Sequence, residues 1–395
     1  MSNDTQPEIR FPGFTDDWEQ RKLGDFVVDY VEKTSVQNQF PMLTSSQQKG
    51  IVLQEDYFAN RQVTTENNIG YFVLPRGYFT FRSRSDNDVF VFNRNDIIDR
   101  GIISYFYPVF TLKSADSDFF LRRINNGIQR QLSIQAEGTG QHVLSLKKFK
   151  NIVAMFPSEE EQQKIGTFFK QLDDTIALHQ RKLDLLKETK KGFLQKMFPK
   201  NGAKVPEIRF PGFTKDWEER KLGDVFSERS ERSSEGELIS VTINSGVIKA
   251  SELDRKDNSS DNKSNYKKVE VGDIAYNSMR MWQGASGYSS YEGILSPAYT
   301  VIIPKEGTDS KFFAYDFKRY DMIQTFKRNS QGLTSDTWNL KFPTLKLVKI
   351  MVPSIEEQKQ IAAFFERLDN TIALHERELD VLKETKKGFL QKMFV

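Results

Sequence analysis

Two stretches in each half of the chain combine arginine, asparagine, glutamine, serine and threonine with aromatic side chains. They are residues 84–95 and 135–144 in the first half and 279–290 and 330–339 in the second. Guanidinium, amide and hydroxyl groups can bond to base edges and hold phosphates. The stretches are therefore candidates for contact with nucleic acid, although surface loops of this composition also arise when a sequence simply drifts.

Motifs for catalysis are absent from the sequence. It contains no GxxxxGK[ST] phosphate loop, no GxGxxG fingerprint, no HExxH and no GxSxG. There is no cysteine, and the only histidines are His142, His179 and His375, so disulfides and thiolate zinc sites are excluded and a transition-metal site is not expected. No two carboxylates pair as an acid/base couple. The sequence therefore argues against an enzyme.

The polar stretches stand on an internal repeat. Residues 157–198 return almost unchanged as 353–394, and 30 of the 41 residues from Ser158 to Phe198 are identical in the second copy. Ser158 with Glu161, and Ser354 with Glu357, have the spacing of a helix capping box. Each segment is therefore predicted to be one long helix, and Pro199 ends the first.

Apolar residues recur along both predicted helices at alternating steps of four and three, which is the spacing of a coiled-coil seam. The first seam is Ile165, Phe169, Leu172, Ile176, His179, Leu183, Leu186, Lys190, Phe193 and Met197. The second is Ile361, Phe365, Leu368, Ile372, His375, Leu379, Leu382, Lys386, Phe389 and Met393. A seam this long needs a partner, and we expect the two helices to pair antiparallel, with the histidines setting the register.

The rest of each half is typical of short strands and turns. Segments rich in aromatic and β-branched residues alternate with glycine, asparagine and aspartate; they include 70–74, 78–81, 89–92, 269–271, 274–276 and 299–303. Helices are expected at about 117–126 and 310–327. Each half is thus predicted to be a mixed α+β domain of about 150 residues, followed by its long helix.

Both halves open with the same sequence, PEIRFPGF, at Pro7–Phe14 and Pro206–Phe213. A tryptophan follows, Trp18 or Trp217, and then RKLGD. An aromatic residue beside a Pro-Gly turn most often packs on a core. We expect these opening segments to dock on their domains.

Composition sets the outer limits of these interpretations. The chain has 395 residues, of which 38% are hydrophobic, which suits two or three packed domains. It has no apolar run of about 18 residues and no signal-peptide pattern at its start, so a cytoplasmic location is the default expectation. The net charge of +3 permits a nucleic-acid partner without indicating one.

The paired layout resembles the specificity subunit of type I restriction–modification systems over nearly the whole chain. The resemblance lies in the FPGFTxDWExRKLGD openings, the GI(I/L)SxxYxV segments at 101–109 and 293–301, and the PSxEEQxxI…LDxTIALHxRxLDxLKETKKGFLQKMF helices, which are highly specific. It implies two target-recognition domains, 1–157 and 201–353, and two spacer helices, 158–200 and 354–395. The helices would form an antiparallel coiled coil with pseudo-twofold symmetry.

The resemblance also implies a function without catalysis. Each domain would read one half of a bipartite site in double-stranded DNA, and the helices would fix the gap between the halves. Two methylation subunits, which use S-adenosylmethionine, and two ATP-dependent restriction/translocase subunits would join the complex. S-adenosylmethionine, ATP and Mg would bind to these partners, and this chain would need no cofactor and no metal.

Given the resemblance, individual DNA contacts can be predicted from the polar stretches. Arginine suits guanine, and asparagine or glutamine suits adenine. The predicted contacts are Arg82, Arg84, Asn93, Arg94, Gln135, Thr139 and Gln141 in the first domain, and Asn277, Arg280, Trp282, Gln283, Ser286, Arg328, Gln331 and Thr334 in the second. Three lysines off the seam, Lys187, Lys191 and Lys196, form either a solvated face or a docking surface for the methylation subunit.

Two other classes of protein compete with this interpretation. One is a coiled-coil adaptor that binds proteins and no nucleic acid, which a gel shift with and without the methylation subunit would distinguish. The other is a self-contained DNA methyltransferase, which is disfavoured because the sequence has no NPPY-type motif. The DNA sequence recognised cannot be inferred from the chain.

Overall fold

The computed structural model describes residues 6–58, 67–138, 140–200, 202–253, 262–334 and 337–394. The chain forms two compact units. Unit 1 comprises Met1–Gln180 and Glu378–Val395, and unit 2 comprises Arg181–Arg377. Each long helix therefore begins in one unit and contributes its last residues to the other.

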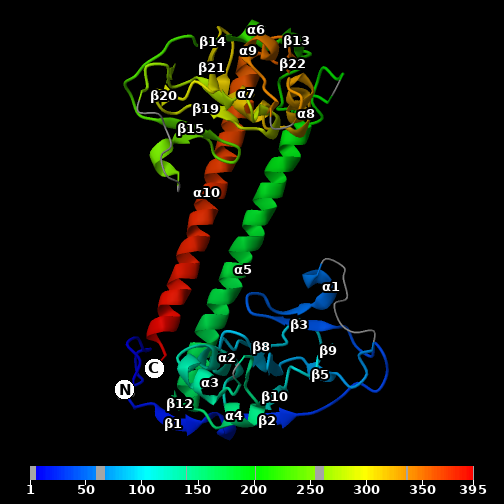
Figure 1. The fold of residues 1–395 in the computed structure, drawn as a ribbon, viewed down its shortest axis with the longest axis vertical. Helices are drawn as coiled ribbons and strands as arrows, with labels where there is room; N and C mark the ends of the chain where they lie inside the picture. The colour runs from blue at the N-terminus through cyan, green and yellow to red at the C-terminus, as the bar shows by residue number, and fades with distance from the viewer. Residues whose placement is uncertain are drawn as a thin grey trace. The chain divides into compact units, whose positions relative to one another are not determined.

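Unit 1 contains short strands, short helices and the first part of a long helix (Figure 1). In chain order these are β1 (Glu19–Lys22), the 3-10 turn η1 (Leu23–Asp25), β2 (Val27–Tyr30), β3 (Leu43–Ser46), β4 (Gly50–Leu53), α1 (Gln54–Tyr57), β5 (Phe72–Pro75), β6 (Phe79–Phe81), β7 (Arg84–Ser85), β8 (Phe92–Arg94), β9 (Arg100–Ile103), β10 (Val109–Leu112), α2 (Ser117–Asn125), α3 (Gln129–Gln135), β11 (His142–Val143), α4 (Leu146–Lys150), β12 (Val153–Phe156) and α5 (Glu159–Lys196).

Unit 2 repeats this plan with variations. Its elements are β13 (Glu218–Lys221), α6 (Leu222–Val225), β14 (Phe226–Glu228), β15 (Ile239–Thr242), β16 (Gly246–Lys249), η2 (Ala250–Glu252), β17 (Lys267–Val269), β18 (Ile274–Asn277), η3 (Met281–Gln283), β19 (Ser286–Tyr288), β20 (Gly293–Leu295), β21 (Tyr299–Pro304), α7 (Ser310–Asp316), α8 (Tyr320–Asn329), α9 (Phe342–Leu345), β22 (Lys349–Val352) and α10 (Ile355–Lys392).

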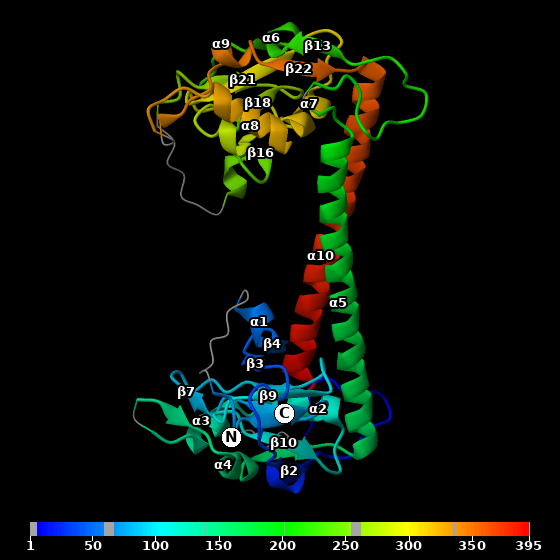
Figure 2. The same ribbon diagram turned by 90° about the vertical axis from the view of Figure 1, so that its right-hand side faces the viewer.

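The sheets of the two units have matching topology. An antiparallel four-stranded sheet has the order β2-β10-β6-β8 in unit 1 and β14-β21-β18-β19 in unit 2. Two-stranded pairs surround it in both units: β3-β4 with β5-β9, and β15-β16 with β17-β20. In unit 1 the β3-β4 hairpin and α1 project from the rest of the domain (Figures 1 and 2). The repeat predicted from the sequence is thus a repeat of the fold.

The predicted helix at 310–327 is divided into two. Helix α7 ends at Asp316 and α8 begins at Tyr320. The buried Asp316 carboxylate accepts a hydrogen bond from Nε of Arg319 at 2.7 Å, which holds the chain in a turn between the helices. Because this turn depends on a tertiary contact, the helical spacing of the sequence does not reveal it.

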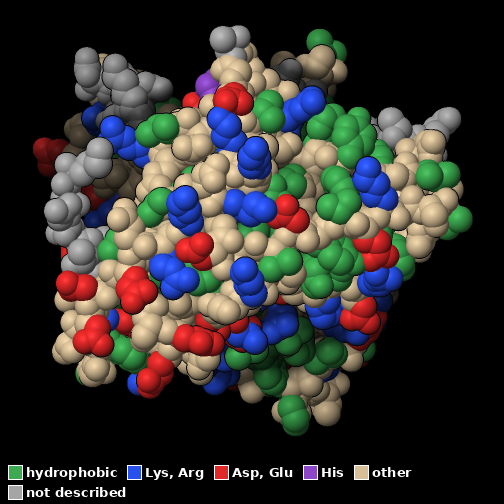
Figure 3. Space-filling view, turned by 90° about the horizontal axis from the view of Figure 1, so that it is seen from below, with side chains coloured by type: hydrophobic (Ala, Val, Ile, Leu, Met, Phe, Trp, Pro, Cys, Tyr) green, Lys and Arg blue, Asp and Glu red, His purple; other side chains and the backbone are tan. Residues whose placement is uncertain are grey.

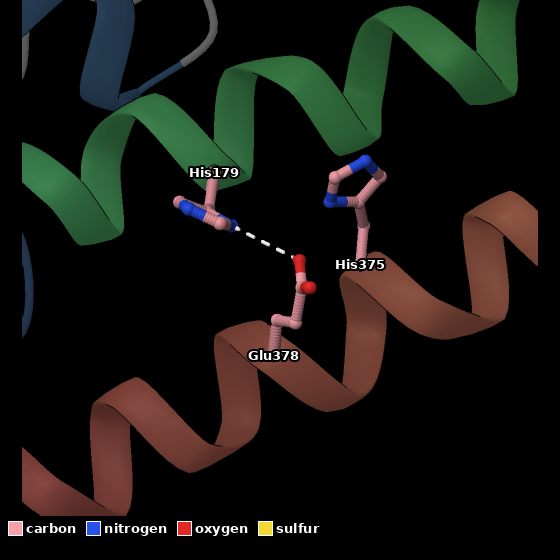
Figure 4. A group of neighbouring side chains, drawn as sticks. All are labelled: His179, His375 and Glu378. Carbon is pink, nitrogen blue, oxygen red and sulfur yellow. Dashed lines mark ion pairs between the residues drawn. The ribbon is translucent and has the colours of Figure 1, made fainter.

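The long helices run antiparallel within each unit. In unit 1, the ring centroids of Phe168 and Phe389 are 5.1 Å apart, and Nζ of Lys386 lies 2.5 Å from the carboxylate of Asp173. Later positions in α5 therefore face earlier positions in α10, which confirms the antiparallel prediction. His179, further along α5, forms an ion pair of 3.7 Å with Glu378 of α10, and Figure 4 shows the two side chains pointing toward one another.

Unit 2 repeats the arrangement with the other ends of the helices. The ring centroids of Phe193 and Phe364 are 5.0 Å apart, and Nζ of Lys190 lies 2.5 Å from the carboxylate of Asp369. Every predicted seam residue in both helices is buried or half-buried. Lys190 and Lys386 interrupt the apolar seam because each reaches a carboxylate of the opposite helix, which fixes the register.

The helix ends complete the cores of the two units. Met393 and Phe394, at the end of α10, are buried with Trp18 and Leu23 in the core of unit 1. Met197 and Phe198, at the end of α5, take the same place with Trp217 in unit 2. The ring centroids of Trp18 and Phe394 are 6.5 Å apart, and those of Trp217 and Phe198 are 6.1 Å apart. The expectation that the opening segments dock on a core is confirmed.

The start of each long helix departs from the predicted capping box. The hydroxyl of Ser158 does accept a hydrogen bond from the Glu161 amide, at 3.4 Å. The carboxylate of Glu161, however, accepts two hydrogen bonds from Arg10, at 2.7 and 2.8 Å, instead of turning back to the Ser158 backbone. Arg209 holds Glu357 in the same way in unit 2, so the RFPGF segment is fastened to the helix by a buried ion pair.

Candidate nucleic-acid interface

The two polar stretches of unit 1 lie side by side. Strands β7 and β11 pair antiparallel, which places Arg84 opposite Val143 and Ser85 opposite His142. Beyond the strands, Nε2 of Gln141 donates a hydrogen bond to Asp86 at 3.1 Å. The stretches 84–95 and 135–144, separated by 39 residues in the sequence, thus form one surface.

Two arginines are exposed on this surface. Arg82 and Arg84 line a pocket of about 520 Å³ together with Asn93 and Tyr107. The guanidinium carbon of Arg84 lies 4.1 Å from the ring centroid of Phe106, a cation–π contact that orients the group and leaves its N–H edge available. Burial raises the pKa of the Tyr107 phenol, and the positive charge of Arg82 opposes that shift. Arg82 and Arg84 are therefore placed to meet an anionic ligand.

Asn93 and Arg94 are committed to the fold of unit 1. Nδ2 of Asn93 donates hydrogen bonds to Oγ of Ser45 at 2.7 Å and to the carbonyl of Ser46 at 3.0 Å. It thereby ties β8 to the β3-β4 hairpin, although its side chain still borders the pocket.

Arg94 forms ion pairs of 2.7 Å with Asp96 and Asp118, and only 13% of its side chain is exposed. Binding a base would require both pairs to break. We therefore remove Arg94 from the predicted interface.

The remaining predicted contacts of unit 1 differ in how exposed their side chains are. Gln135 is half-buried at the end of α3, and Gln141 is exposed. Thr139 lies outside the described residues. The surface thus keeps Arg82, Arg84 and Gln141 as its exposed members from the sequence prediction.

Sequence reasoning missed the turn of the β3-β4 hairpin. Oγ of Ser46 accepts hydrogen bonds from the amides of Gln48 at 3.3 Å and Lys49 at 3.2 Å, which fixes the turn. Gln47 and Gln48 line the same pocket as Arg82. The sequence signal was a polar Ser-Ser-Gln-Gln-Lys-Gly run between two strand-like segments, but nothing in it showed which loops the run would adjoin.

The two polar stretches of unit 2 also meet, through aromatic packing. The ring centroids of Trp282 and Trp338 are 5.2 Å apart, with the rings edge to face. Nζ of Lys327 lies 5.6 Å from the ring centroid of Trp338. The turn after β18 and the loop 330–339 therefore form one surface, without the strand pair found in unit 1.

Exposed side chains on this surface include Arg280, Arg328, Gln331 and Thr334. Arg280 donates a hydrogen bond to the half-buried Gln283 at 3.1 Å. Arg328 donates to Oγ1 of Thr325 at 3.0 Å. All these partners are uncharged, so both guanidinium groups keep charge and donors for a ligand.

Ser286 and Asn277 do not fit their predicted roles equally well. Ser286 lies in β19 and is completely buried, at 0% exposure, so no base can reach it. The stretch 279–290 re-enters the sheet there, and we therefore leave Ser286 out of the proposed contacts. Asn277 is half-buried, and its Oδ1 accepts a hydrogen bond from the Met279 amide at 3.0 Å, which shapes the turn that carries Arg280.

A lysine that the sequence did not single out holds the unit 2 surface together. Nζ of Lys318 donates hydrogen bonds to the carbonyls of Ile243 at 2.8 Å and Gly284 at 2.6 Å. It joins the β15-β16 hairpin turn to the turn that carries Trp282. Burial, and secondarily the charge of Lys190, lowers the pKa of Lys318 to about 8. Lys318 thus links the hairpin to the rest of unit 2, as Asn93 does in unit 1.

No broad basic field replaces these local contacts on the face of the molecule shown in Figure 3. Lysine and arginine side chains there are interspersed with carboxylates and apolar side chains. This agrees with the small net charge of +3.

The fold and the paired surfaces define a protein built from two DNA-specificity domains. The family model "Type I restriction modification DNA specificity domain" matches residues 15–188 and again residues 214–384. The chain belongs to this family. No helix within the described ranges has the length and apolar character needed to traverse a bilayer.

Relatives and solved structures agree with the family. The chain is 26% identical, over 66% of its length, to the type I restriction enzyme MjaVIII specificity subunit of Methanocaldococcus jannaschii, and the match spans 65% of that protein. The S subunit of a type I restriction–modification system from M. genitalium has the same fold, with a TM-score of 0.59, 13% identity and 99% coverage of both chains.

A structure that describes complex assembly and conformational transition of the type I R-M system is also similar. Its TM-score is 0.50 at 16% identity, and the match covers 98% of this chain and 99% of that one. At these identities the similarity concerns the fold.

Proposed function

We propose that this chain is the non-catalytic subunit that selects the DNA sequence for a type I restriction–modification complex. Each unit would read one half of a bipartite site in double-stranded DNA. The observation that carries the proposal is the juxtaposition, in both units, of two dissimilar polar loops on the same frame of strands. A shared frame with different loops is what two readers with different targets require.

The chemistry of the exposed side chains supports reading in both units. Arginine can bond bidentately to guanine, and glutamine to adenine. The contacts that we retain are Arg82, Arg84, Gln135 and Gln141 in unit 1, and Arg280, Trp282, Gln283, Arg328, Gln331 and Thr334 in unit 2. The hairpin-turn residues Gln47 and Gln48 are added to unit 1 because they border the same pocket.

The helices would set the gap between the half-sites and recruit the partner subunits. Antiparallel pairing in each unit, locked by Lys386–Asp173 or Lys190–Asp369, supports a role as a rigid spacer. Two methylation subunits and two restriction/translocase subunits would bind to the assembled chain. S-adenosylmethionine, ATP and Mg would be bound by those subunits.

Methylome sequencing tests the proposal most directly. A host expressing this chain with its methylation subunit should acquire methyladenine at one bipartite motif. Arg84→Ala should relax or abolish one half of the motif and Arg280→Ala the other, because each removes a guanidinium from a different unit. If both variants leave both half-sites unchanged, the arginines are not readers.

Matched controls come from the repeat itself. Arg21 and Arg220 are equivalent exposed arginines on β1 and β13, away from the loops. Arg21→Ala and Arg220→Ala should preserve the motif. Absence of any motif with the unmodified chain would favour the adaptor function over DNA reading.

A further inference from the structure

Unit 1 has exposed aromatic rings in the turn between β9 and β10. The side chain of Tyr105 is 59% exposed. Its ring centroid lies 4.3 Å from that of Phe106 and 6.1 Å from that of Tyr71. The guanidinium carbon of Arg84 lies 4.1 Å from the Phe106 ring centroid, so the tilted rings of Tyr105 and Phe106 form an aromatic platform with a cation beside it.

Backbone hydrogen bonds fix this platform beside the predicted reading loop. The carbonyl of Phe106 accepts hydrogen bonds from the amide of Ser83 at 3.0 Å and from its hydroxyl at 2.7 Å. Ser83 lies between Arg82 and Arg84 in the sequence. The turn cannot move independently of the two arginines, so a ligand on Arg84 also meets Tyr105.

The equivalent turn of unit 2 shows that the rings are not needed for folding. Its sequence is Ser296-Pro-Ala-Tyr299, against Ser104-Tyr-Phe-Tyr107 in unit 1. Both turns close with the same hydrogen bond, Tyr107 N to Ser104 O at 2.9 Å and Tyr299 N to Ser296 O at 3.0 Å. Because the turn forms equally well with proline and alanine, the exposed rings of unit 1 call for another explanation.

Unit 2 has its own aromatic pair at a different place in the chain. Trp282 and Trp338 pack at its loops, with Lys327 over Trp338 as the accompanying cation. Both units thus combine aromatic rings with a cation next to their polar loops, although the residues are not equivalent. In a duplex, rings placed in this way can contact thymine methyl groups in the major groove, or a base face where a base step is unstacked.

We propose that Tyr105 and Phe106 form a ring-face contact with a nucleotide in the half-site of unit 1, as part of its sequence recognition. The contact rests on the proposed DNA-reading function and extends it to a turn outside both polar stretches. Tyr105 supplies the contact surface. Phe106 supports it and holds the guanidinium of Arg84 at its edge.

The test exchanges the unit 1 turn for that of unit 2. The full chain is assembled with its methylation subunit, and the probe is a duplex containing the motif that the unmodified complex methylates. Tyr105→Pro with Phe106→Ala should weaken binding about tenfold or more at every salt concentration, since stacking contacts have effects of this size. In Tyr105→Ser, which leaves Phe106 and the guanidinium of Arg84 in place, the slope of affinity against salt should stay the same, because no phosphate contact is removed.

Single variants separate contact from folding. Tyr105→Phe keeps the ring and should bind within about twofold of the unmodified chain. Tyr105→Ser removes an exposed ring without a backbone change, and should weaken binding about fivefold. Replacing each dT of the unit 1 half-site by dU in turn removes one thymine methyl group at a time. If Tyr105 contacts a thymine methyl group, one of these replacements should weaken binding of the unmodified chain but not of Tyr105→Ser. If Tyr105 contacts a base face, each replacement should change the affinity of both proteins equally.

Binding of the turn exchange and of Tyr105→Ser within twofold of the unmodified chain would overturn the ring contact and leave the proposed function intact. A reduced salt slope in Tyr105→Ser would also overturn it, since the loss would then be a phosphate contact. If the unmodified complex does not distinguish the motif from a scrambled duplex, the proposed function fails, and the ring contact fails with it.

Discussion

The two units hold their polar stretches and their hairpin together by different contacts. Unit 1 brings its polar stretches together through the β7-β11 strand pair and ties the β3-β4 hairpin to them through Asn93. Unit 2 uses the Trp282–Trp338 contact and ties its hairpin through the Lys318 ammonium. The three surface elements thus remain neighbours although the side chains that join them differ between the units. This indicates that the frame determines where the loops lie, and that the loops are free to change their chemistry.

Both units share a buried arginine–glutamate ion pair, and its loss should destabilise both units equally. Arg10→Ala would leave the Glu161 carboxylate, which has 0% exposure, buried without a partner. Loss of one member of a buried pair costs about 3–5 kcal/mol. Arg209→Ala should have the same effect in unit 2, where Glu357 is 1% exposed. Hydrogen exchange of the full chain measures the two units separately.

The double variant Arg10→Ala with Glu161→Gln provides the control for that prediction. Removing the orphaned charge should recover much of the lost stability. A large loss in one unit and none in the other would show that the shared frame is not equivalent in the two halves.

Lys318 should give unit 2 a pH dependence that unit 1 lacks. Its pKa is lowered to about 8 in the folded chain, against about 10.5 unfolded. Between these values the unfolded chain binds more protons, so the free energy of unfolding should rise with pH by up to about 3 kcal/mol. Urea unfolding of the unmodified chain and of Lys318→Met, from pH 7.5 to pH 10, measures the difference.

The rise of the free energy of unfolding with pH should be absent from Lys318→Met. It should remain in the control variant Lys341→Met, which changes an exposed lysine. Parallel stability curves for all three proteins would mean that folding does not lower the pKa of Lys318.

The Trp282–Trp338 contact of unit 2 should contribute less free energy than the buried ion pairs or the deprotonation of Lys318. Trp338→Ala removes the partner of Trp282 and the ring under Lys327, and edge-to-face pairs contribute about 0.5–1.5 kcal/mol beyond their buried area. We expect about fivefold weaker binding to the half-site read by unit 2, with the other half-site unaffected. Trp338→Phe should keep most of the affinity, and an equal loss at both half-sites would contradict the assignment.

The sequence predicted the repeated features well because they depend on local periodicity. The seam from Ile165 to Met197 is read from steps of four and three, and the docking of Trp18 from its Pro-Gly turn. The sequence did not show that the two polar stretches of each unit would meet. Contacts such as Arg10 with Glu161, or Lys318 with the Gly284 carbonyl, join residues far apart in the sequence, and no periodicity reports them.

The same limit explains why two predicted contacts are left out of the proposed interface. Arg94 and Ser286 lie in stretches of the right composition, but the first pairs with Asp118 and the second returns to the sheet. Composition shows that a loop is polar, whereas side-chain partners decide which of its groups remain available. Arg84 and Arg280 stayed exposed because their nearest partners are an aromatic ring and an uncharged amide.

The smallest effect concerns one ion pair that the helices form in unit 2 only. Nζ of Lys187 lies 2.7 Å from the carboxylate of Glu376, so this lysine contacts the other helix and is more than part of a solvated face. The equivalent residues in unit 1 are Lys383 and Gln180. Gln180→Glu would place a carboxylate opposite Lys383 and should stabilise unit 1 by about 0.5 kcal/mol, the size typical of exposed pairs.

Lys187→Ala should lower the stability of unit 2 by a similar amount, since both members of its pair are about half exposed. Salt screens exposed pairs, so both effects should disappear near 1 M salt. Hydrogen exchange at low and high salt measures them in the full chain. If Gln180→Glu destabilises unit 1 instead, the helices do not have the same register there as in unit 2, and the symmetry between the units ends at the polar flank of the seam.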